Sequence, residues 1–174
     1  MQKPRNSLKL YKYFPAIIVI LFDQLSKLHI VYNYNLYDSK LIFKDIIKFT
    51  YVENPGVAFG INLGKNMNLV LFSISFLIII LMILYIQKLD SQNKLFITGI
   101  SLIIGGAIGN FIDRVATVLS PLFLSNKKGV VDFIDIGYGT FRWFTFNVAD
   151  IAITLGAIIY IYLSNEESDR LQNL

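Results

Sequence analysis

Acidic side chains at the edges of apolar segments are the residues of this sequence best suited to chemistry. Asp150 is the third residue of the apolar run 148–163 and follows Phe146 and Asn147 in the stretch FNVAD. A carboxylate in the first turn of a helix lies where water, lipid headgroups and the positive end of the helix dipole meet. The simpler interpretation is a charge that only caps a membrane-spanning helix. An ionisable group at membrane depth is nevertheless a functional candidate by default.

A second acidic segment, GVVDFID at 129–135, precedes this run. Asp132 and Asp135 are flanked by Val, Phe and Ile, which favours partial burial. Burial raises the pKa of a carboxyl group, and a neighbouring carboxylate raises one member of the pair further. Two carboxyl groups that share one proton can activate a water, because one acts as the base while the other polarises the carbonyl under attack. The spacing leaves open whether Asp132 or Asp135 meets Asp150, and ordinary surface acids are the simpler alternative.

Further polar residues lie inside the apolar runs. Asp23 and Lys27, in the first run, are four residues apart, so they share a helix face and can pair. An internal salt bridge that holds helices together is the favoured interpretation of this pair.

The third apolar run ends in GGAIGNFIDR at 105–114. Gly105 and Gly109 form a small-xxx-small pair, which predicts close approach of a neighbouring helix. Asn110, Asp113 and Arg114 share one face by the three-and-four rule. The guanidinium fork of Arg114 suits bidentate binding of a carboxylate or a phosphate.

Composition restricts the class of protein. The chain has 174 residues, of which 55% are apolar, and no cysteine, which excludes a thiol nucleophile, a cysteine metal site and a disulfide. The single histidine, His29, argues against a multi-histidine metal site and a Ser-His-Asp array. The net charge of +4 comes from lysines spread through tails and loops, which indicates a membrane surface rather than nucleic acid.

Apolar runs predict a membrane all-α fold, a four-transmembrane-helix bundle. Parts of 32–51 alternate apolar and polar residues, which fits a short sheet or an interfacial helix, and the expected fold is this bundle with a small β-rich loop domain on the outer face. The helices are expected over about 14–32, 69–86, 95–112 and 148–163, within one domain covering 1–174. Lysine and arginine are denser in the tails and the 88–94 turn, so both termini are expected inside and the loops 33–68 and 115–146 outside. The residues that this topology brings to the outer face are Asn54 in an NPG turn, Arg114, Asp132 and Asp150.

Five segments together resemble a known family. They are DQLSK at 23–27, NPGVAFG at 54–60, GGAIGNFIDR at 105–114, VVDF at 130–133 and FNVADIAI at 146–153. In this order they resemble the motifs of the lipoprotein signal peptidases (signal peptidase II), which are bacterial inner-membrane aspartic endopeptidases. Each segment alone is weak evidence, but the set covers nearly the whole chain.

The resemblance implies roles for individual residues. Asp132 and Asp150 would be the catalytic pair. The residues that would line the site or orient the carboxylates are Asn54, Asn110, Arg114 and Asn147. Asp23 and Lys27 would support them from the first helix. The loop 34–62 would form a small sheet on the membrane with a gating segment over the site.

The resemblance also implies partners. The substrate would be a prolipoprotein whose lipobox cysteine carries diacylglycerol, cut just before that cysteine. Membrane lipid is the other expected partner, with no metal, organic cofactor or nucleic acid, and a monomer is expected. The link 115–131 is longer than the link usual in the family, and its polar part 120–128 is interpreted as an added loop.

A different class of function fits some of the same residues. Asp23, Lys27 and Arg114 could line an ion or proton path in a small ion- or proton-coupled transport subunit. A relay needs acids spread through the membrane depth, whereas most polar residues here cluster at one face. A purely structural membrane scaffold is the third hypothesis, and it predicts that apolar replacements of these residues are tolerated.

Overall fold

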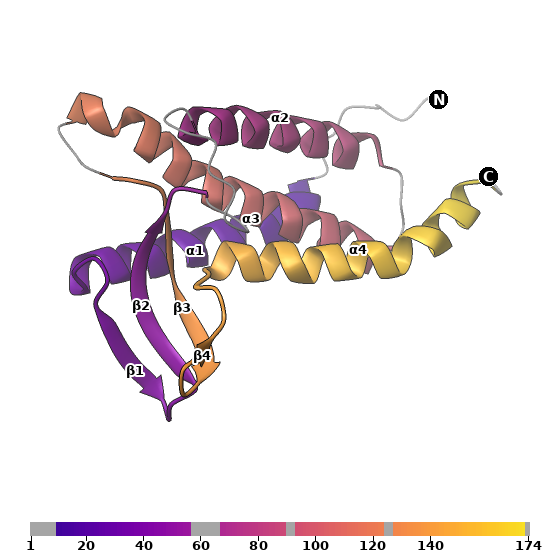
Figure 1. The fold of residues 1–174 in the computed structure, drawn as a ribbon. Helices are drawn as coiled ribbons and strands as arrows, with labels where there is room; N and C mark the ends of the chain where they lie inside the picture. Colours follow the sequence, from indigo (N-terminus) through magenta and orange to yellow (C-terminus); the bar gives the residue numbers. More distant parts are fainter. Residues whose placement is uncertain (1–9, 57–66, 90–92, 124–126, 173–174) are drawn as a thin grey trace.

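The protein is mostly helical and carries a small antiparallel sheet at one end of its helices (Figure 1). A computed structural model of the chain describes residues 10–56, 67–89, 93–123 and 127–172. The helices are η1 Leu10–Tyr13, α1 Phe14–Asn33, α2 Met67–Lys88, α3 Lys94–Leu119, η3 Ser120–Phe123 and α4 Val148–Gln172.

Among the described residues, three helical segments are long and apolar enough to cross a membrane, namely Leu10–Asn33, Asn68–Lys88 and Lys94–Leu119. The second has a mean hydropathy of 3.0 with only 11% of its apolar window buried, so most of its apolar surface faces outward. Such a surface is stable in lipid and not in water. The apolar part of α4, Val148–Ser164, is shorter than these three segments.

Helix α3 extends seven residues beyond its predicted end, since it ends at Leu119 rather than at 112. Residues 115–119, expected in an outer loop, are therefore helical. The hydroxyl of Thr117 donates to the carbonyl of Asp113 within this last part of the helix. The helix ends before Pro121, which has no N–H for the α-helical ladder, and the 3-10 turn η3 takes its place. The first part of the predicted added loop 120–128 is thus the 3-10 helix η3.

Glycines of α3 let two other helices approach it closely. A Cβ atom on Gly105 would lie 2.8 Å from the Cα of Ala16 in α1, and one on Gly106 would lie 2.4 Å from the carbonyl oxygen of Ala149 in α4. Real Cβ contacts are never that short, so these positions exclude any side chain. The close approach predicted from Gly105 and Gly109 is confirmed, with α1 as the partner of both glycines.

The sheet has the strand order β1-β2-β3-β4, with every pair antiparallel. Its strands are β1 Ser39–Phe43, β2 Ile47–Asn54, β3 Val130–Tyr138 and β4 Phe141–Arg142. A bulge between Phe49 and Val52 re-aims β2, so that Val52 then pairs with Asp132. The predicted sheet within 34–62 is present in β1 and β2, whereas residues 57–66, which include the end of that segment, lie outside the described residues.

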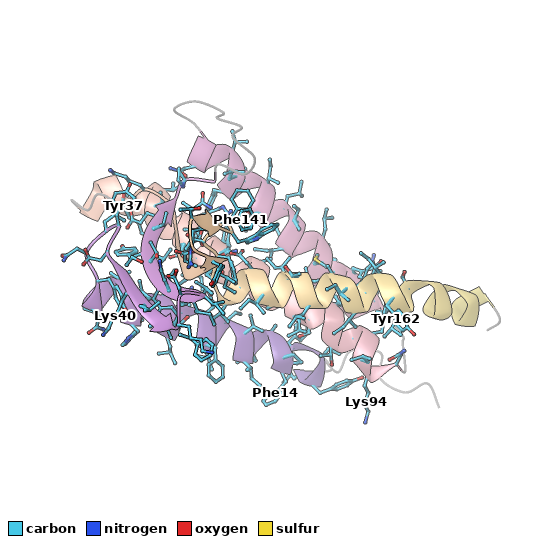
Figure 2. The ribbon with its side chains drawn as sticks, turned by 60° about the horizontal axis from the view of Figure 1, so that its bottom comes forward. Phe14, Tyr37, Lys40, Lys94, Phe141 and Tyr162 are labelled. Atoms are coloured by element: carbon cyan, nitrogen blue, oxygen red, sulfur yellow. The ribbon has the colours of Figure 1, made fainter. Side chains whose placement is uncertain are left out.

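An apolar core packs the sheet against the end of α1. Ile30 of α1 packs with Tyr51 of β2 and with Val131 and Phe133 of β3, and all four are buried. The start of α1 and the end of α4 lie at the other end of the bundle (Figure 1). In Figure 2 the labelled Tyr37, Lys40 and Phe141 mark the sheet end, while Lys94 and Tyr162 lie towards the other end.

Replacing Gly106 by leucine should destabilise the fold, because the new side chain meets the Ala149 backbone of α4. We expect a loss of about 1–3 kcal/mol in the free energy of unfolding, measured by thermal unfolding in detergent. The matched control is Ala116→Leu, which adds a leucine at an exposed position of the same helix. Equal stability of the two variants would contradict the close α3–α4 contact.

Candidate active site

Asp150 occupies the first turn of α4, where it completes a reciprocal cap with Asn147. The backbone N–H of Asn147 donates to Oδ2 of Asp150 at 3.1 Å, and the backbone N–H of Asp150 donates to Oδ1 of Asn147 at 3.0 Å. This is a capping box, which satisfies two N–H groups that the start of a helix leaves unpaired. The carboxylate of Asp150 is thereby held in one orientation at the positive end of the helix dipole.

Asp132 reaches the same place from β3. Its side chain is 3% exposed, with Oδ1 2.6 Å from Nδ2 of Asn147 and Oδ2 3.0 Å from Nδ2 of Asn54. Asn54 is itself held at the end of β2, because its Oδ1 accepts from the N–H of Gly56 at 2.9 Å. Gly56 has a φ of +95°, a conformation that other residues avoid. The NPG turn thus aims Asn54 at Asp132.

Two buried asparagines, Asn110 and Asn147, connect the two carboxyl groups by hydrogen bonds. Nδ2 of Asn110 donates to Oδ1 of Asp150 at 2.8 Å, and Oδ1 of Asn110 accepts from Nδ2 of Asn147 at 3.0 Å. Asn147 is fully buried and Asn110 is 8% exposed. Asp132 and Asp150 are therefore neighbours within one hydrogen-bonded network, although 18 positions separate them along the chain.

Burial and the nearby carboxylate of Asp150 raise the pKa of Asp132 to about 7. Hydrogen bonds from Asn54 and Asn147 and the charge of Lys27 oppose this shift without cancelling it. Two close carboxyl groups that cannot both ionise titrate as a unit. The arrangement can hold one proton between two acids near neutral pH, which is the state that water activation requires.

Arg114 lies on α3 beside the two acids. Its guanidinium is partly buried and interacts electrostatically with Asp150, Asp113 and Asp132. A fixed positive charge beside a carboxyl pair offsets the negative charge that the pair carries. Arg114 is therefore placed to balance the negative charge of the two acids.

Asp23 and Lys27 of α1 form the predicted ion pair, on the side of Asn110 that faces α1. Nζ of Lys27 is 2.8 Å from Oδ2 of Asp23, and the two side chains are 3% and 0% exposed. Oδ1 of Asp23 accepts from the N–H of Ala149 at 2.9 Å, so this carboxylate also caps α4 from α1. Nζ of Lys27 donates to Oδ1 of Asn110 at 3.0 Å, which connects the pair to the network above. All eight residues singled out from the sequence therefore lie in one region of the molecule.

Asp135, the alternative partner of Asp150, points elsewhere. Its Oδ1 accepts from Nε of Arg142 at 2.9 Å and its Oδ2 from the hydroxyl of Thr50 at 3.1 Å. Arg142 also donates to the carbonyl of Asp45 at 3.1 Å, which fastens the β1–β2 turn to β3. Side chains alternate between the two faces of a strand, and β3 is regular because the bulge lies in β2. Asp132 and Asp135 are three residues apart in β3, so their side chains point to opposite faces of the sheet.

Sequence reasoning missed one part of the network. The sequence pattern predicts only a shared helix face for Asp113 and only a loop for Lys127. In the structure Asp113 contacts both Lys27 and Lys127. The only sequence signal was the shared face of Asn110, Asp113 and Arg114. Within residues 10–56, 67–89, 93–123 and 127–172, no group of three or more His, Asp or Glu could hold a metal ion.

Comparison with known proteins decides the family. The profile of the family described as Signal peptidase (SPase) II matches residues 15–165 of the chain. The chain belongs to the signal peptidase II family. A lipoprotein signal peptidase from Lactobacillus johnsonii is 38% identical over 149 residues, which is 85% of this chain and 88% of that protein. The one from Buchnera aphidicola is 37% identical, covering 94% of this chain and 97% of that protein.

Solved structures of bacterial membrane enzymes agree with this assignment. One, obtained by the in meso method at 2.3 Å resolution, has a TM-score of 0.77 at 30% identity and covers 97% of this chain and 96% of its own. Another, at 1.9 Å, has a TM-score of 0.73 at 32% identity, covering 92% and 96%. With its membrane-length helices, this member of the signal peptidase II family is a bacterial membrane protease.

The raised pKa of Asp132 predicts how stability depends on pH. The folded protein keeps the Asp132 proton up to about pH 7, whereas the unfolded chain releases it near pH 3.8. The unfolded state then binds fewer protons over this window, so the contribution of Asp132 to stability is lost as the pH rises towards 7. We expect the unfolding temperature to fall between pH 5.5 and 7.5 in the unmodified protein and to fall less in Asp132→Asn. Parallel curves for the two proteins would contradict the raised pKa.

Proposed function

We propose that this signal peptidase II hydrolyses the peptide bond before the diacylglyceryl-modified lipobox cysteine of prolipoproteins and releases the signal peptide. Asp132 and Asp150 are the catalytic pair of this aspartic endopeptidase. The observation that carries the proposal is that one residue, Asn147, donates hydrogen bonds to both carboxyl groups. Relatives with the name lipoprotein signal peptidase support the substrate class.

The chemistry follows from the shared proton. Asp150, capped by Asn147 and Asn110, acts as the base and removes a proton from water as the water oxygen bonds to the scissile carbonyl carbon. Asp132 holds the other proton and polarises the carbonyl oxygen, which becomes a hydroxyl of the tetrahedral intermediate. Collapse of this intermediate breaks the C–N bond, the cysteine nitrogen leaves with the proton that Asp150 took up, and one hydroxyl of the intermediate returns its proton to Asp132 as the new carboxyl group forms.

The remaining polar residues bind and orient. Arg114 and Asn54 contact the substrate backbone at the edge of the site, because each lies next to one of the acids. Asn110 and Asn147 orient the carboxylates, and Asp23 with Lys27 supports α4 and Asn110 from α1. No metal or organic cofactor has a role in this mechanism.

The membrane supplies the alignment of the substrate. Acyl chains hold the modified cysteine in one leaflet, so the bond before it lies at headgroup depth. Asp150 starts α4 at the end of the bundle that carries the sheet, where that depth would be reached. Confinement of the enzyme and its substrate to the bilayer reduces the loss of translational and rotational entropy on binding.

The proposed topology has four membrane-spanning helices in one domain covering 1–174, with the protein acting as a monomer in the bacterial inner membrane. Helix α4 crosses the membrane through its apolar stretch Val148–Ser164, which has 17 residues and spans about 25 Å. The sheet and the candidate site face outward, and both termini face the cytoplasm. Exposed aromatic side chains before α4 would lie at the outer interface, namely Phe141, Trp143 and Phe144.

Transport is the second class of function considered above, and the geometry does not favour it. An ion path needs charges that face a continuous water-filled route. Here Asp23, Lys27 and Asp113 are buried and paired with one another. Proton flux through liposomes that depends on Asp23 would favour transport over hydrolysis.

Asparagine at either catalytic position should abolish processing and leave a folded protein. We expect Asp132→Asn and Asp150→Asn to lower the cleavage rate of a diacylated precursor peptide by about 10²–10⁴-fold or more, since the base or the acid is lost. Cleavage is measured by mass spectrometry, with an unacylated peptide of the same sequence beside it. The unmodified enzyme should cut only the acylated peptide.

The control for this experiment is Asp45→Asn. Asp45 lies on the β1–β2 turn with its side chain 57% exposed, so its loss should leave cleavage unchanged. Full activity in either catalytic variant would remove the assignment of the pair. Equal cutting of both peptides would remove the lipid requirement.

The absence of cysteine allows a direct test of the topology. Tyr138→Cys places one thiol on the sheet and Lys94→Cys places one at the opposite end of the bundle, both at exposed positions. A membrane-impermeant maleimide added to intact spheroplasts should label the first variant and label the second only after permeabilisation. The reverse pattern, or labelling of both in intact cells, would contradict the proposed orientation.

A further inference from the structure

Four charges of alternating sign form a continuous line beneath the catalytic pair. Nζ of Lys127 is 2.5 Å from Oδ1 of Asp113, whose Oδ2 is 2.8 Å from Nζ of Lys27. Lys27 in turn is 2.8 Å from Oδ2 of Asp23. Opposite charges buried together are stabilised by one another, and removal of one leaves its neighbour uncompensated.

Lys127 is the member of this line that reaches solvent. Its side chain is 23% exposed, whereas the side chains of Asp113, Lys27 and Asp23 are 5%, 3% and 0% exposed. It belongs to the segment between η3 and β3, which is outside the five family-like segments. No role for this lysine follows from those segments.

The backbone around Lys127 is held in place on both sides. The carbonyl of Lys127 accepts from the hydroxyl of Ser120 at 3.4 Å, and the carbonyl of Gly129 accepts from the hydroxyl of Thr117 at 3.3 Å. The N–H of Lys128 donates to Oε2 of Glu53 at 2.8 Å. The position of the Lys127 ammonium next to Asp113 is therefore set by α3 and β2, and β3 with Asp132 begins three residues later.

We propose that Lys127 is an electrostatic positioning residue that neutralises Asp113, keeps Lys27 on Asn110, and so sets the pH range in which the Asp132–Asp150 pair works. The proposal rests on the proposed peptidase function. Lys27 divides its contacts among Asp23, Asp113 and Asn110. Without Lys127, Asp113 would draw Lys27 away from Asn110, the residue that donates to Asp150.

The charges that face Asp132 give the direction of the effect. Those that act on it directly are Asp150 of α4, Arg114 of α3 and Lys27 of α1, and Lys27 in turn contacts Asp113 and Asp23. The neighbouring strand β2 contributes Tyr51 and Glu53, whose side chains hydrogen-bond each other. Lys127, Asp113, Lys27 and Asp23 sum to zero, and Arg114 offsets a pair that shares one proton. Loss of Lys127 leaves one net negative charge, which disfavours ionisation of the pair and raises the pKa of Asp132 further.

The test compares Lys127→Met with Lys127→Arg in the full-length enzyme. We measure kcat/KM for the diacylated precursor peptide from pH 5 to pH 9. We expect the limbs of the profile to move towards alkaline pH by about half a unit to one unit in Lys127→Met, and to stay in place in Lys127→Arg, which keeps the charge. A role in packing alone would change the height of the profile without moving its limbs.

Lys128→Met is the matched control. Lys128 is the next residue and is exposed, so its charge is screened by solvent and its loss should leave the limbs in place. An unmoved profile in Lys127→Met, or an equal shift in Lys128→Met, would overturn the proposal.

A second variant covers the case in which Lys127→Met does not fold. Lys127→Met combined with Asp113→Asn removes both charges, so the double variant should fold and its profile limbs should return towards those of the unmodified enzyme. A double variant with limbs displaced as far as in Lys127→Met, or one that also fails to fold, would count against the proposal.

The same shift can be measured without catalysis. The pH dependence of the unfolding temperature reports Asp132 directly, and its midpoint should rise in Lys127→Met. An unmodified protein that does not cut the acylated peptide would remove the proposed function, while this measurement would still decide the role of Lys127.

Discussion

The side chain of Asn147 is the contact on which the arrangement of both carboxyl groups depends. Its amide nitrogen reaches Asp132 on the sheet, and its amide oxygen closes the cap with Asp150 on α4. The residue is fully buried, so each hydrogen bond forms without competition from water and is costly to lose. One side chain thereby joins a strand and a helix at the point where the proposed chemistry takes place.

The helices that support this contact approach one another closely. Glycines on α3 face α1 and α4, and a Cβ on Gly109 would lie 2.6 Å from Oδ2 of Asp23. Close backbones bring Asp23 of α1 within reach of the first N–H groups of α4. Small residues therefore serve the site indirectly, since they bring together polar groups that larger side chains would hold apart.

Buried charges in this protein are paired from one end of the network to the other. Lys27 contacts two carboxylates and one amide oxygen, and Arg114 interacts with the acids above it. Removing such ions from water is costly unless each has a partner. The result is a rigid polar base beneath Asp132 and Asp150, in a bundle whose outer surface is apolar. In the proposed function this base keeps two acids close together at a depth where a lipid-anchored substrate presents its bond.

The membrane class, the approximate helices and the set of polar residues could be predicted from the chain alone, because apolar run length and charge placement are local properties. The sequence also supported the family, since five short segments in order carry more information than any spacing alone. The predicted end of α3 is too early, because Asp113 and Arg114 interrupt the apolar run after Ile112 whereas the helix continues to Leu119.

Whether Asp132 or Asp135 lies next to Asp150 depends on tertiary packing. Asp132 and Asp135 have similar neighbours in sequence, and the pairing of β3 with β2 turns one to Asn147 and the other to Arg142. The contact between Lys127 and Asp113 could not be predicted from the sequence either, since the two residues are 14 positions apart and the contact depends on how the segment after α3 folds back. Such contacts arise from the packing of distant segments, and no local pattern of residues encodes them.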